Sequence, residues 1–156
     1  MSKENCMWNP IQTHQDILRL LVDTEQFHDS CIKEIKYLSG AFVDNSLAMH
    51  PINSLRKLSI LIQRQSNFLS TIEIEFGGLI YFYLSPVDER FSCEILDGDM
   101  CLHNGCIYWG DCGKIFPEET ENYPGTLICA ESCRWRVVNN GLGNAAFYKT
   151  EDSTEP

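Results

Sequence analysis

The chain has 156 residues, enough for one compact domain, and 44% of them are hydrophobic, which supplies the material for a core. No apolar run is long enough to cross a bilayer, and the N-terminal segment lacks the apolar stretch of a secretory signal, so we expect a cytoplasmic protein without membrane contact. The formal net charge of −10 also argues against direct binding to nucleic acid.

A helix is expected over residues 10–25, where apolar residues recur at helical spacing. Asn9 is its predicted N-cap, Pro10 suits the first helical position, and Gln12 has the spacing of a capping box. The face predicted to lie on a sheet carries six apolar side chains: Ile11, Ile17, Leu18, Leu20, Leu21 and Val22.

Residues 31–37 are predicted to form the first strand, and Lys33 and Lys36 do not fit one polar face, which indicates an edge or a bulge. Residues 40–53 lack a clean period and indicate a loop or a frayed hairpin. Three strand-like runs then follow within 57–84, with alternating apolar residues that are typical of half-buried strands.

The short spacing between these three runs predicts antiparallel pairing, with tight turns at Ser66-Asn67 and Gly77-Gly78. Further strands are expected at Phe91–Leu96, after which Asp97-Gly98-Asp99 turns the chain, and in a hairpin of 100–102 with 106–109 that Asn104-Gly105 closes.

Residues 113–125 hold two prolines and no period, so we expect an exposed loop. A last strand is predicted over 126–138, and its core face is predicted to carry Leu127, Cys129, Glu131, Cys133, Trp135 and Val137. The predicted class is therefore α+β: one domain over 1–149, with the N-terminal helix packed on a predominantly antiparallel sheet or partly open barrel of about 6–8 strands. Residues 150–156 are expected to be a disordered acidic tail.

Most of the negative charge lies in residues 86–131, where ten carboxylates face only Arg90 and Lys114, a net charge of −8. A surface of one sign speeds the encounter with an oppositely charged partner, although it can also serve solubility alone. The predicted partner-binding residues are the carboxylates of this region together with two aromatic residues that flank its turn at 110–111: Asp97, Asp99, Tyr108, Trp109, Asp111, Glu118, Glu119 and Glu121.

Eight cysteines in a chain without a secretory signal are expected to be reduced thiols that fill the core. The best metal candidates are Cys101, Cys106 and Cys112, with a fourth ligand from Cys93, His103, Cys129 or Cys133. Paired Cys-x-x-Cys spacing, which brings two thiolates to one zinc ion, is missing, so we predict neither a metal nor a cofactor.

Four polar or nucleophilic residue types adjoin in His28-Asp29-Ser30-Cys31, at the boundary between a predicted helix and a predicted strand. Adjacent residues seldom face one another, so capping or turn formation explains them better than catalysis. The chain contains no phosphate-binding loop, nucleophile elbow, zinc-protease helix motif or dinucleotide fingerprint, and we therefore predict no enzymatic activity.

The chain resembles a group of small β-rich bacterial proteins with an N-terminal Phe-His-Asp segment. The resemblance rests on Phe27-His28-Asp29-Ser30-Cys31-Ile32-Lys33-Glu34-Ile35, followed by amphipathic strands, a strand-Gly-Gly-strand and a late Arg134-Trp135-Arg136. Some of these are regarded as immunity proteins of contact-dependent or polymorphic toxin systems. The resemblance covers residues 27–136 in pattern. It implies a cytoplasmic inhibitor that binds a toxin domain, and it carries over no catalytic residues.

Together these features predict a stoichiometric inhibitor of the immunity or counter-defence type, whose acidic surface in 86–131 blocks a basic protein partner such as a toxin or nuclease. One alternative is a small enzyme or ligand-binding domain with a pocket between the N-terminal helix and the sheet, and His28, Asp29 or a cysteine at its rim. Another is an adaptor subunit that uses an exposed apolar patch or an open sheet edge.

Overall fold

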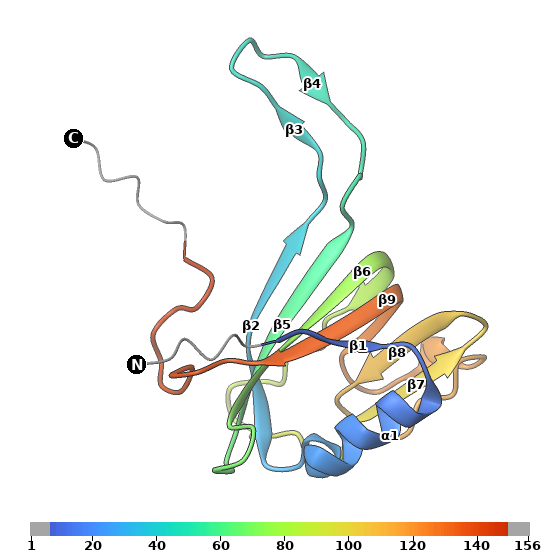
Figure 1. The fold of residues 1–156 in the computed structure, drawn as a ribbon, viewed down its shortest axis with the longest axis vertical. Coiled ribbons are helices and arrows are strands. Elements are labelled where there is room, and N and C mark those ends of the chain that lie inside the picture. The colour runs from blue at the N-terminus through green and yellow to red at the C-terminus, as the bar shows by residue number, and fades with distance from the viewer. Residues whose placement is uncertain (1–6, 150–156) are drawn as a thin grey trace.

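An open antiparallel β-sheet with one α-helix on its face forms the body of the protein in a computed structural model that describes residues 7–149 (Figure 1). The strands of this sheet run in the order β2-β5-β6-β9-β8-β7, and β1 pairs with β9 beside them. Their bounds are β1 (Asn9–Ile11), β2 (Ser30–Leu38), β5 (Lys57–Arg64), β6 (Thr71–Tyr83), β7 (Asp99–His103), β8 (Cys106–Gly110) and β9 (Leu127–Val137). The predicted class, a helix on a mostly antiparallel sheet, is confirmed, and the sheet is not closed into a barrel. The predicted tail at 150–156 lies outside the described residues.

The helix α1 (His14–Asp23) begins four residues later than predicted. Thr13 is its N-cap: its hydroxyl accepts a hydrogen bond from the backbone N–H of Asp16 (3.2 Å), and the Asp16 carboxylate accepts one from the backbone N–H of Thr13 (2.9 Å). The predicted cap at Asn9 is wrong because residues 9–11 pair with β9 instead, where Pro10 is tolerated in a short peripheral strand.

Only part of the predicted helix face is buried. Ile17 and Leu20 pack into the core, whereas Leu18 and Val22 are exposed. Ile17 and Leu20 lie three positions apart, on one stripe of the helix, and Leu21 beside them is partly buried against the core.

The core lies between α1 and the face of the sheet toward it. Rows of directly opposed side chains run across the strands, and side chains in such a row share one face. Phe82, Ile128, Trp109 and Met100 form one row across β6, β9, β8 and β7. Phe27, which precedes β2, completes the packing with its ring edge-to-face on Trp109 at 5.7 Å between centroids.

The predicted turn at Gly77-Gly78 is wrong, because β6 continues through it as one 13-residue strand. Gly78 has φ +60°, and a Cβ there would collide with the Glu131 carboxylate of the neighbouring strand. Side chains on one face of a strand normally recur every two residues, but here the interval on β6 is three, from Phe76 to Leu79. The paired strand β9 has the same interval, from Cys133 to Ala130. The glycine pair therefore changes which residues face the core without ending the strand.

Of the remaining predictions for the strands, two are confirmed and one is wrong. The hairpin of β7 with β8 is confirmed, with positive φ at Asn104 (50°) and Gly105 (75°) as a tight two-residue turn requires. Strand β2 is an edge strand with an irregularity between Ile32 and Glu34, so both features predicted for it are present. The strand predicted at residues 91–96 is wrong: only Ile95 forms a bridge, to Ser30, and the side chains around it are exposed.

Residues 40–53, predicted as a loop or frayed hairpin, form a hairpin of two short strands, β3 (Phe42–Val43) and β4 (Met49–His50). We call residues 39–56 the arm. Figure 1 shows it projecting from the ends of β2 and β5, well beyond the rest of the sheet.

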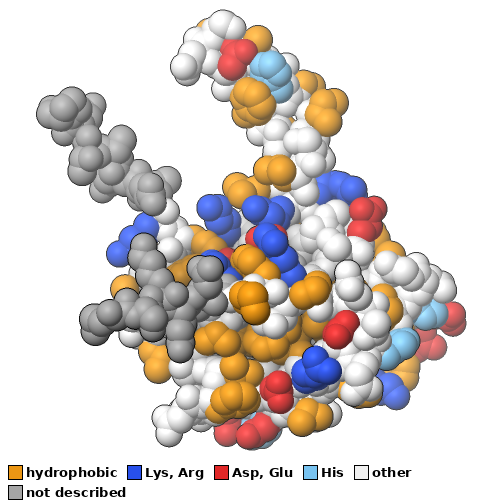
Figure 2. All heavy atoms as spheres, in the orientation of Figure 1, with side chains coloured by type: hydrophobic (Ala, Val, Ile, Leu, Met, Phe, Trp, Pro, Cys, Tyr) orange, Lys and Arg blue, Asp and Glu red, His pale blue; other side chains and the backbone are white. Residues whose placement is uncertain are grey.

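The sheet face opposite the core carries ion pairs. Arg136 binds Glu73 at 2.7 Å, Arg134 binds Glu75 at 2.8 Å, and the ring of Trp8 lies over both guanidinium groups at 4.3 and 4.6 Å. The C-terminal segment also docks here, because the Glu34 carboxylate accepts two of its backbone N–H groups. Figure 2 shows Lys and Arg side chains gathered on this face below the arm. None of the helices among residues 7–149 is long and apolar enough to cross a membrane.

Truncation of Trp109 to alanine tests the core assignment. The side chain is 0% exposed, so we expect a loss of about 3–5 kcal/mol in the free energy of unfolding, measured by urea denaturation. The exposed Phe116 provides the matched control, and its change to alanine is expected to alter stability by no more than about 0.5 kcal/mol. Equal effects of the two changes would contradict the assignment.

Candidate partner-binding surface

The loop at residues 113–125, predicted to be simply exposed, covers the part of the outer sheet face around Tyr81, the face turned away from α1. Ile115 is 3% exposed, and its backbone N–H donates to the Asp99 carboxylate at 2.8 Å. The Tyr123 hydroxyl donates to the carbonyl of Gly113 (3.0 Å) and accepts from the N–H of Cys112 (2.8 Å). The loop is thus held in one conformation by its apolar and polar anchors.

A row of tyrosine and cysteine side chains lies beneath this loop. Tyr81, Cys129, Tyr108 and Cys101 oppose one another across β6, β9, β8 and β7, one residue out of phase with the core row, so they occupy the outer face. The Tyr81 hydroxyl donates to the Thr120 side chain of the loop at 3.2 Å. Row and loop therefore form a small second layer on the outer face.

Tyr83 extends this layer to the surface. Its ring stacks on that of Tyr81 at 4.9 Å between centroids, and the residue is 54% exposed. A tyrosine held by stacking and open to solvent is the kind of side chain that anchors protein contacts. Sequence reasoning did not select it. The alternation of Tyr81 and Tyr83 at the end of β6 shows that both side chains share one face of the sheet. The sequence does not show the strand register that places Tyr83 beside the loop.

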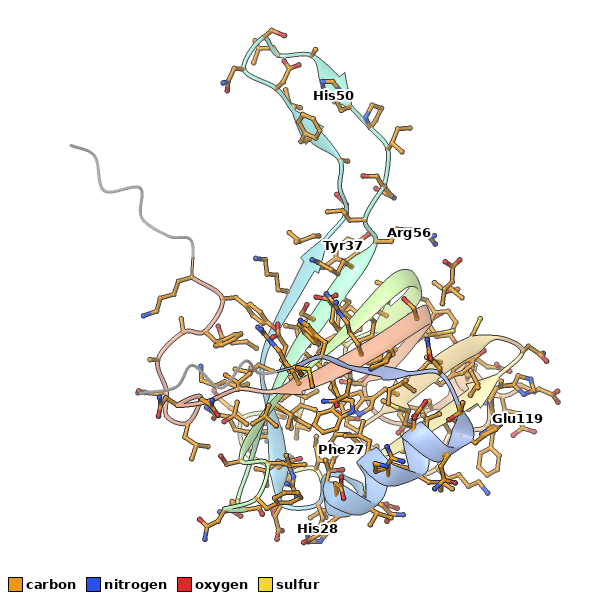
Figure 3. The ribbon with its side chains drawn as sticks, in the orientation of Figure 1. Phe27, His28, Tyr37, His50, Arg56 and Glu119 are labelled. Atoms are coloured by element: carbon orange, nitrogen blue, oxygen red, sulfur yellow. The ribbon has the colours of Figure 1, made fainter. Side chains whose placement is uncertain are left out.

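Three of the predicted site residues, Glu118, Glu119 and Glu121, are exposed on this loop. Figure 3 places Glu119 at the β7–β8 end of the molecule, away from the arm. Glu118 lies 4.0 Å from the ring of His103 in the neighbouring hairpin. We call Glu118, Glu119, Glu121 and Tyr83 the acidic loop surface.

The aspartates among the predicted residues are placed differently. Asp99 and Asp111 accept backbone hydrogen bonds, from Ile115 and from Thr126 at 2.8 Å each, so they fasten the two ends of the loop. Burial raises the pKa of the Asp111 carboxyl. Asp97 is exposed, and its backbone carbonyl accepts from Gly113. Two of the three aspartates are therefore structural groups.

The prediction that Trp109 lies at an exposed surface is wrong, because its side chain is in the core row against Phe27. Its indole N–H has no hydrogen-bond partner among residues 7–149. Tyr108 is half-buried under the loop, and burial raises its pKa, so it stays neutral. The alternation of β8 sends Tyr108 outward and Trp109 inward, and the sequence could not assign these directions without the partner strands.

The cysteines do not gather into a metal site in the part of the chain that the structure describes, where no group of three or more His, Cys, Asp or Glu could hold an ion. Burial raises the pKa of Cys101 to about 11 and also raises that of Cys129. A ligand thiol must lose its proton, so these two side chains favour packing over coordination at neutral pH. Cys6 lies outside the described residues.

The His28-Asp29-Ser30-Cys31 segment follows an unusual turn. Glu25, Gln26 and Phe27 have φ of 51°, 55° and 60°, a left-handed conformation that costs roughly 1–2 kcal/mol per residue. Figure 3 shows the result: Phe27 points into the body, and His28 lies at the surface. Burial of the Phe27 ring against Trp109 compensates for the strain.

Hydrogen bonds account for the polar groups of this turn. The Ser30 hydroxyl donates to the Phe27 carbonyl, and Gly98 N–H donates to the Gln26 carbonyl at 2.8 Å. His28 Nδ1 lies 2.8 Å from the Asp29 carboxylate, and burial raises the pKa of Cys31. These contacts are those of a turn.

The recess between α1 and the sheet is small, about 190 Å³, and Asn9, Gln12, Asp16 and Trp135 are among its lining residues. Ligand sites usually enclose about 300–1,000 Å³, so the alternative of a pocket at this place loses support. Larger recesses lie elsewhere. Those of about 390 and 440 Å³ lie between the start of β2 and the segment around Cys93, and one of about 590 Å³ lies between Lys33 and Gly143.

Substitution of Asp111 tests the anchoring of the loop. Asp111→Ala removes the acceptor of the Thr126 N–H, so we expect a loss of about 1–3 kcal/mol in the free energy of unfolding. Asp111→Asn keeps the acceptor and removes a buried charge, so its stability near pH 7 should equal or exceed that of the wild type.

The sign of the pH effect follows from the raised pKa. The folded protein holds the Asp111 proton more tightly than the unfolded chain, so acidification toward that pKa relieves the cost of the charge. Any advantage of Asp111→Asn should therefore shrink as the pH falls, in urea unfolding at several pH values. An advantage that grows on acidification would contradict the role given to Asp111.

Comparison of the chain with protein families, with curated proteins and with solved structures gives no match.

Proposed function

We propose that the protein is a stoichiometric inhibitor of the immunity or counter-defence type, and that its acidic loop surface binds a basic protein partner such as a toxin or nuclease. One observation carries the proposal. A loop fastened at both ends presents three exposed carboxylates beside an exposed, stacked tyrosine. Charge and an aromatic anchor are the two ingredients of a fast and specific protein contact.

The loop is suited to binding because it is already ordered. Ile115, Tyr123 and Thr120 fix it through burial and hydrogen bonds before any partner arrives. Ordering a mobile loop on binding costs free energy, so a preformed loop keeps more of its contact energy as affinity. Such an inhibitor would act by covering a basic cleft and blocking access to it.

The charge distribution supports one orientation for the partner. The cations of the chain concentrate on the outer face near Arg134 and Arg136, where Glu73 and Glu75 pair with them (Figure 2). In the acidic loop surface, Glu119 lies at the β7–β8 end (Figure 3) and Glu118 lies 4.0 Å from His103 of that hairpin, and Lys114 is the one cation between residues 91 and 133 of the sequence. A basic partner is therefore drawn to the β7–β8 end.

Neutralisation of the loop carboxylates tests the charge contribution. A Glu118→Gln, Glu119→Gln, Glu121→Gln variant is expected to associate more slowly with the partner, with a flatter salt dependence, in binding kinetics at two salt concentrations. The partner is first captured from cells of the source with reduced wild-type bait. The control variant changes three carboxylates elsewhere: Asp23→Asn, Glu89→Gln and Glu94→Gln. Equal association rates for the two variants would contradict the proposed contribution of the loop carboxylates.

Truncation of Tyr83 tests the anchor. Tyr83→Ala should speed dissociation and weaken binding by about 2 kcal/mol, roughly 30-fold in Kd, because a central aromatic side chain carries much of an interface energy. Phe91→Ala is the control, since Phe91 is also exposed but lies outside the loop. The proposal for this residue fails if the two variants bind equally well.

A further inference from the structure

The arm carries a group of apolar side chains that the body does not cover. Leu47 is 85% exposed, and five other apolar side chains of the arm are more than half exposed: Phe42, Val43, Met49, Ile52 and Leu55. These side chains lie on both faces of the ribbon, because Phe42 pairs with His50 and the next residue, Val43, pairs with Met49. Together they offer roughly several hundred Å² of apolar surface, and exposed apolar surface on that scale usually marks a contact site.

The arm is nevertheless ordered. Asp44 organises its tip by accepting hydrogen bonds from the Ser46 side chain (2.6 Å) and the Ala48 backbone (3.1 Å), and it lies 2.9 Å from the ring of His50. The rings of Phe42 and His50 stack at 4.4 Å between centroids. These contacts hold the shape of a ribbon that has no core of its own.

A two-stranded ribbon is at best marginally stable alone in water, and here only two residue pairs join its strands. Burial of its apolar side chains against another surface would add the missing stabilisation. The arm therefore has the form of an element completed by a partner.

The charges of the arm narrow the choice of partner. Asp44 is the only charged residue between Gly40 and Leu55, so the projecting part of the arm has no Lys or Arg to bind nucleic acid, and a carboxylate at its tip opposes insertion into a bilayer. Two copies of the chain, each with a net charge of −10, repel one another where their acidic surfaces face each other. The arms are nearly neutral, so two arms can pack together without this charge repulsion.

We propose that two copies of the protein associate through their arms, packed antiparallel about a twofold axis. From Ser39 to Asn45 an extended arm spans roughly 20 Å, so two arms can overlap along that length. In this arrangement the Asp44 tip of each arm lies near the arm base of the other copy, where Arg56 and Lys57 supply positive charge. The same surface then serves both copies, as a twofold interface requires.

Figure 3 shows the geometry that the proposal uses. His50 lies on the outer part of the arm, and Tyr37 and Arg56 lie at its base, where the arm joins the sheet. The Arg56 guanidinium reaches Leu79 and Glu131 of the body at 3.5 Å each, and remains 41% exposed in its side chain. The arm projects beyond the body, so the two bodies stay apart when the arms overlap.

Sedimentation of the full-length reduced protein over a wide concentration range tests this proposal. We expect the wild type to reach the mass of a dimer at high concentration. Leu47→Gln with Met49→Gln should shift the monomer–dimer midpoint at least tenfold upward, because it removes apolar contact without adding charge. The matched control, Leu18→Gln with Val22→Gln, alters two exposed apolar residues of α1 and should leave the midpoint unchanged.

A second variant removes the arm. Residues 40–54 are replaced by Asn-Gly, a change that the fold permits because the backbone N–H of Leu55 already donates to the carbonyl of Ser39 at 3.0 Å. This variant should be a monomer with unchanged far-UV circular dichroism of the sheet. A photo-crosslinking residue at position 45 of the intact arm should attach to residues 36–57 of the second copy.

Three results would overturn the proposal. They are a wild type that is monomeric at every concentration, a dimer that both arm variants keep, and crosslinks from position 45 to the body outside 36–57. If the wild type is monomeric and the arm variants instead lose the partner captured through the acidic loop surface, the arm belongs to that heterologous interface and the second copy is excluded.

Discussion

The pairing of β9 with both β6 and β8 is the constraint on which the rest of the structure depends. Through it, side chains from four strands line up in alternating rows, and each row belongs wholly to one face. The row of Phe82, Ile128, Trp109 and Met100 builds the core. The adjacent row, with Tyr81 and Cys129, creates the platform on which the 113–125 loop lies. A slip of one residue in this register would exchange the two faces and remove both the core and the platform.

The outer face is used in two different ways along β9. Its first half, around Cys129, carries the loop with the exposed carboxylates. Its second half, with Arg134 and Arg136, carries ion pairs, the Trp8 ring and the C-terminal segment. The step at Gly77-Gly78 separates these halves. One strand thus links a basic region, whose arginines pair with glutamates, with an acidic region whose carboxylates are exposed.

Local patterns in the sequence predicted the strands well and their exposure less well. Alternation located β5 and β9, and Asn104-Gly105 located the β7–β8 turn, because these signals act between near neighbours in the chain. The step at Gly77-Gly78 defeated the alternation argument, since Ile128 and Ala130 face the core instead of Leu127 and Cys129. On β9 the step passes through Glu131, and it matches the step at Gly77-Gly78 of the paired strand β6, a contact between strands that no local pattern contains.

The candidate surface was predicted only in part for the same reason. Glu118, Glu119 and Glu121 could be expected at the surface from their loop alone. Trp109, predicted at the surface, lies in the core, and Tyr83, which was not selected, is exposed. The register with β9 sets which side chains point inward and which outward. The left-handed turn at 25–27 had no sequence signal either, since glycine, the usual marker of positive φ, is absent from those positions.

Hydrogen exchange on the complex with the partner captured from source cells tests the central claim most directly. The account predicts that binding slows amide exchange in residues 114–123 and 81–85, around the acidic loop surface, and leaves the Trp8 and Arg134 side of the sheet unchanged. Protection confined to that opposite side, with none in the loop, would contradict the claim that this surface is where the partner binds.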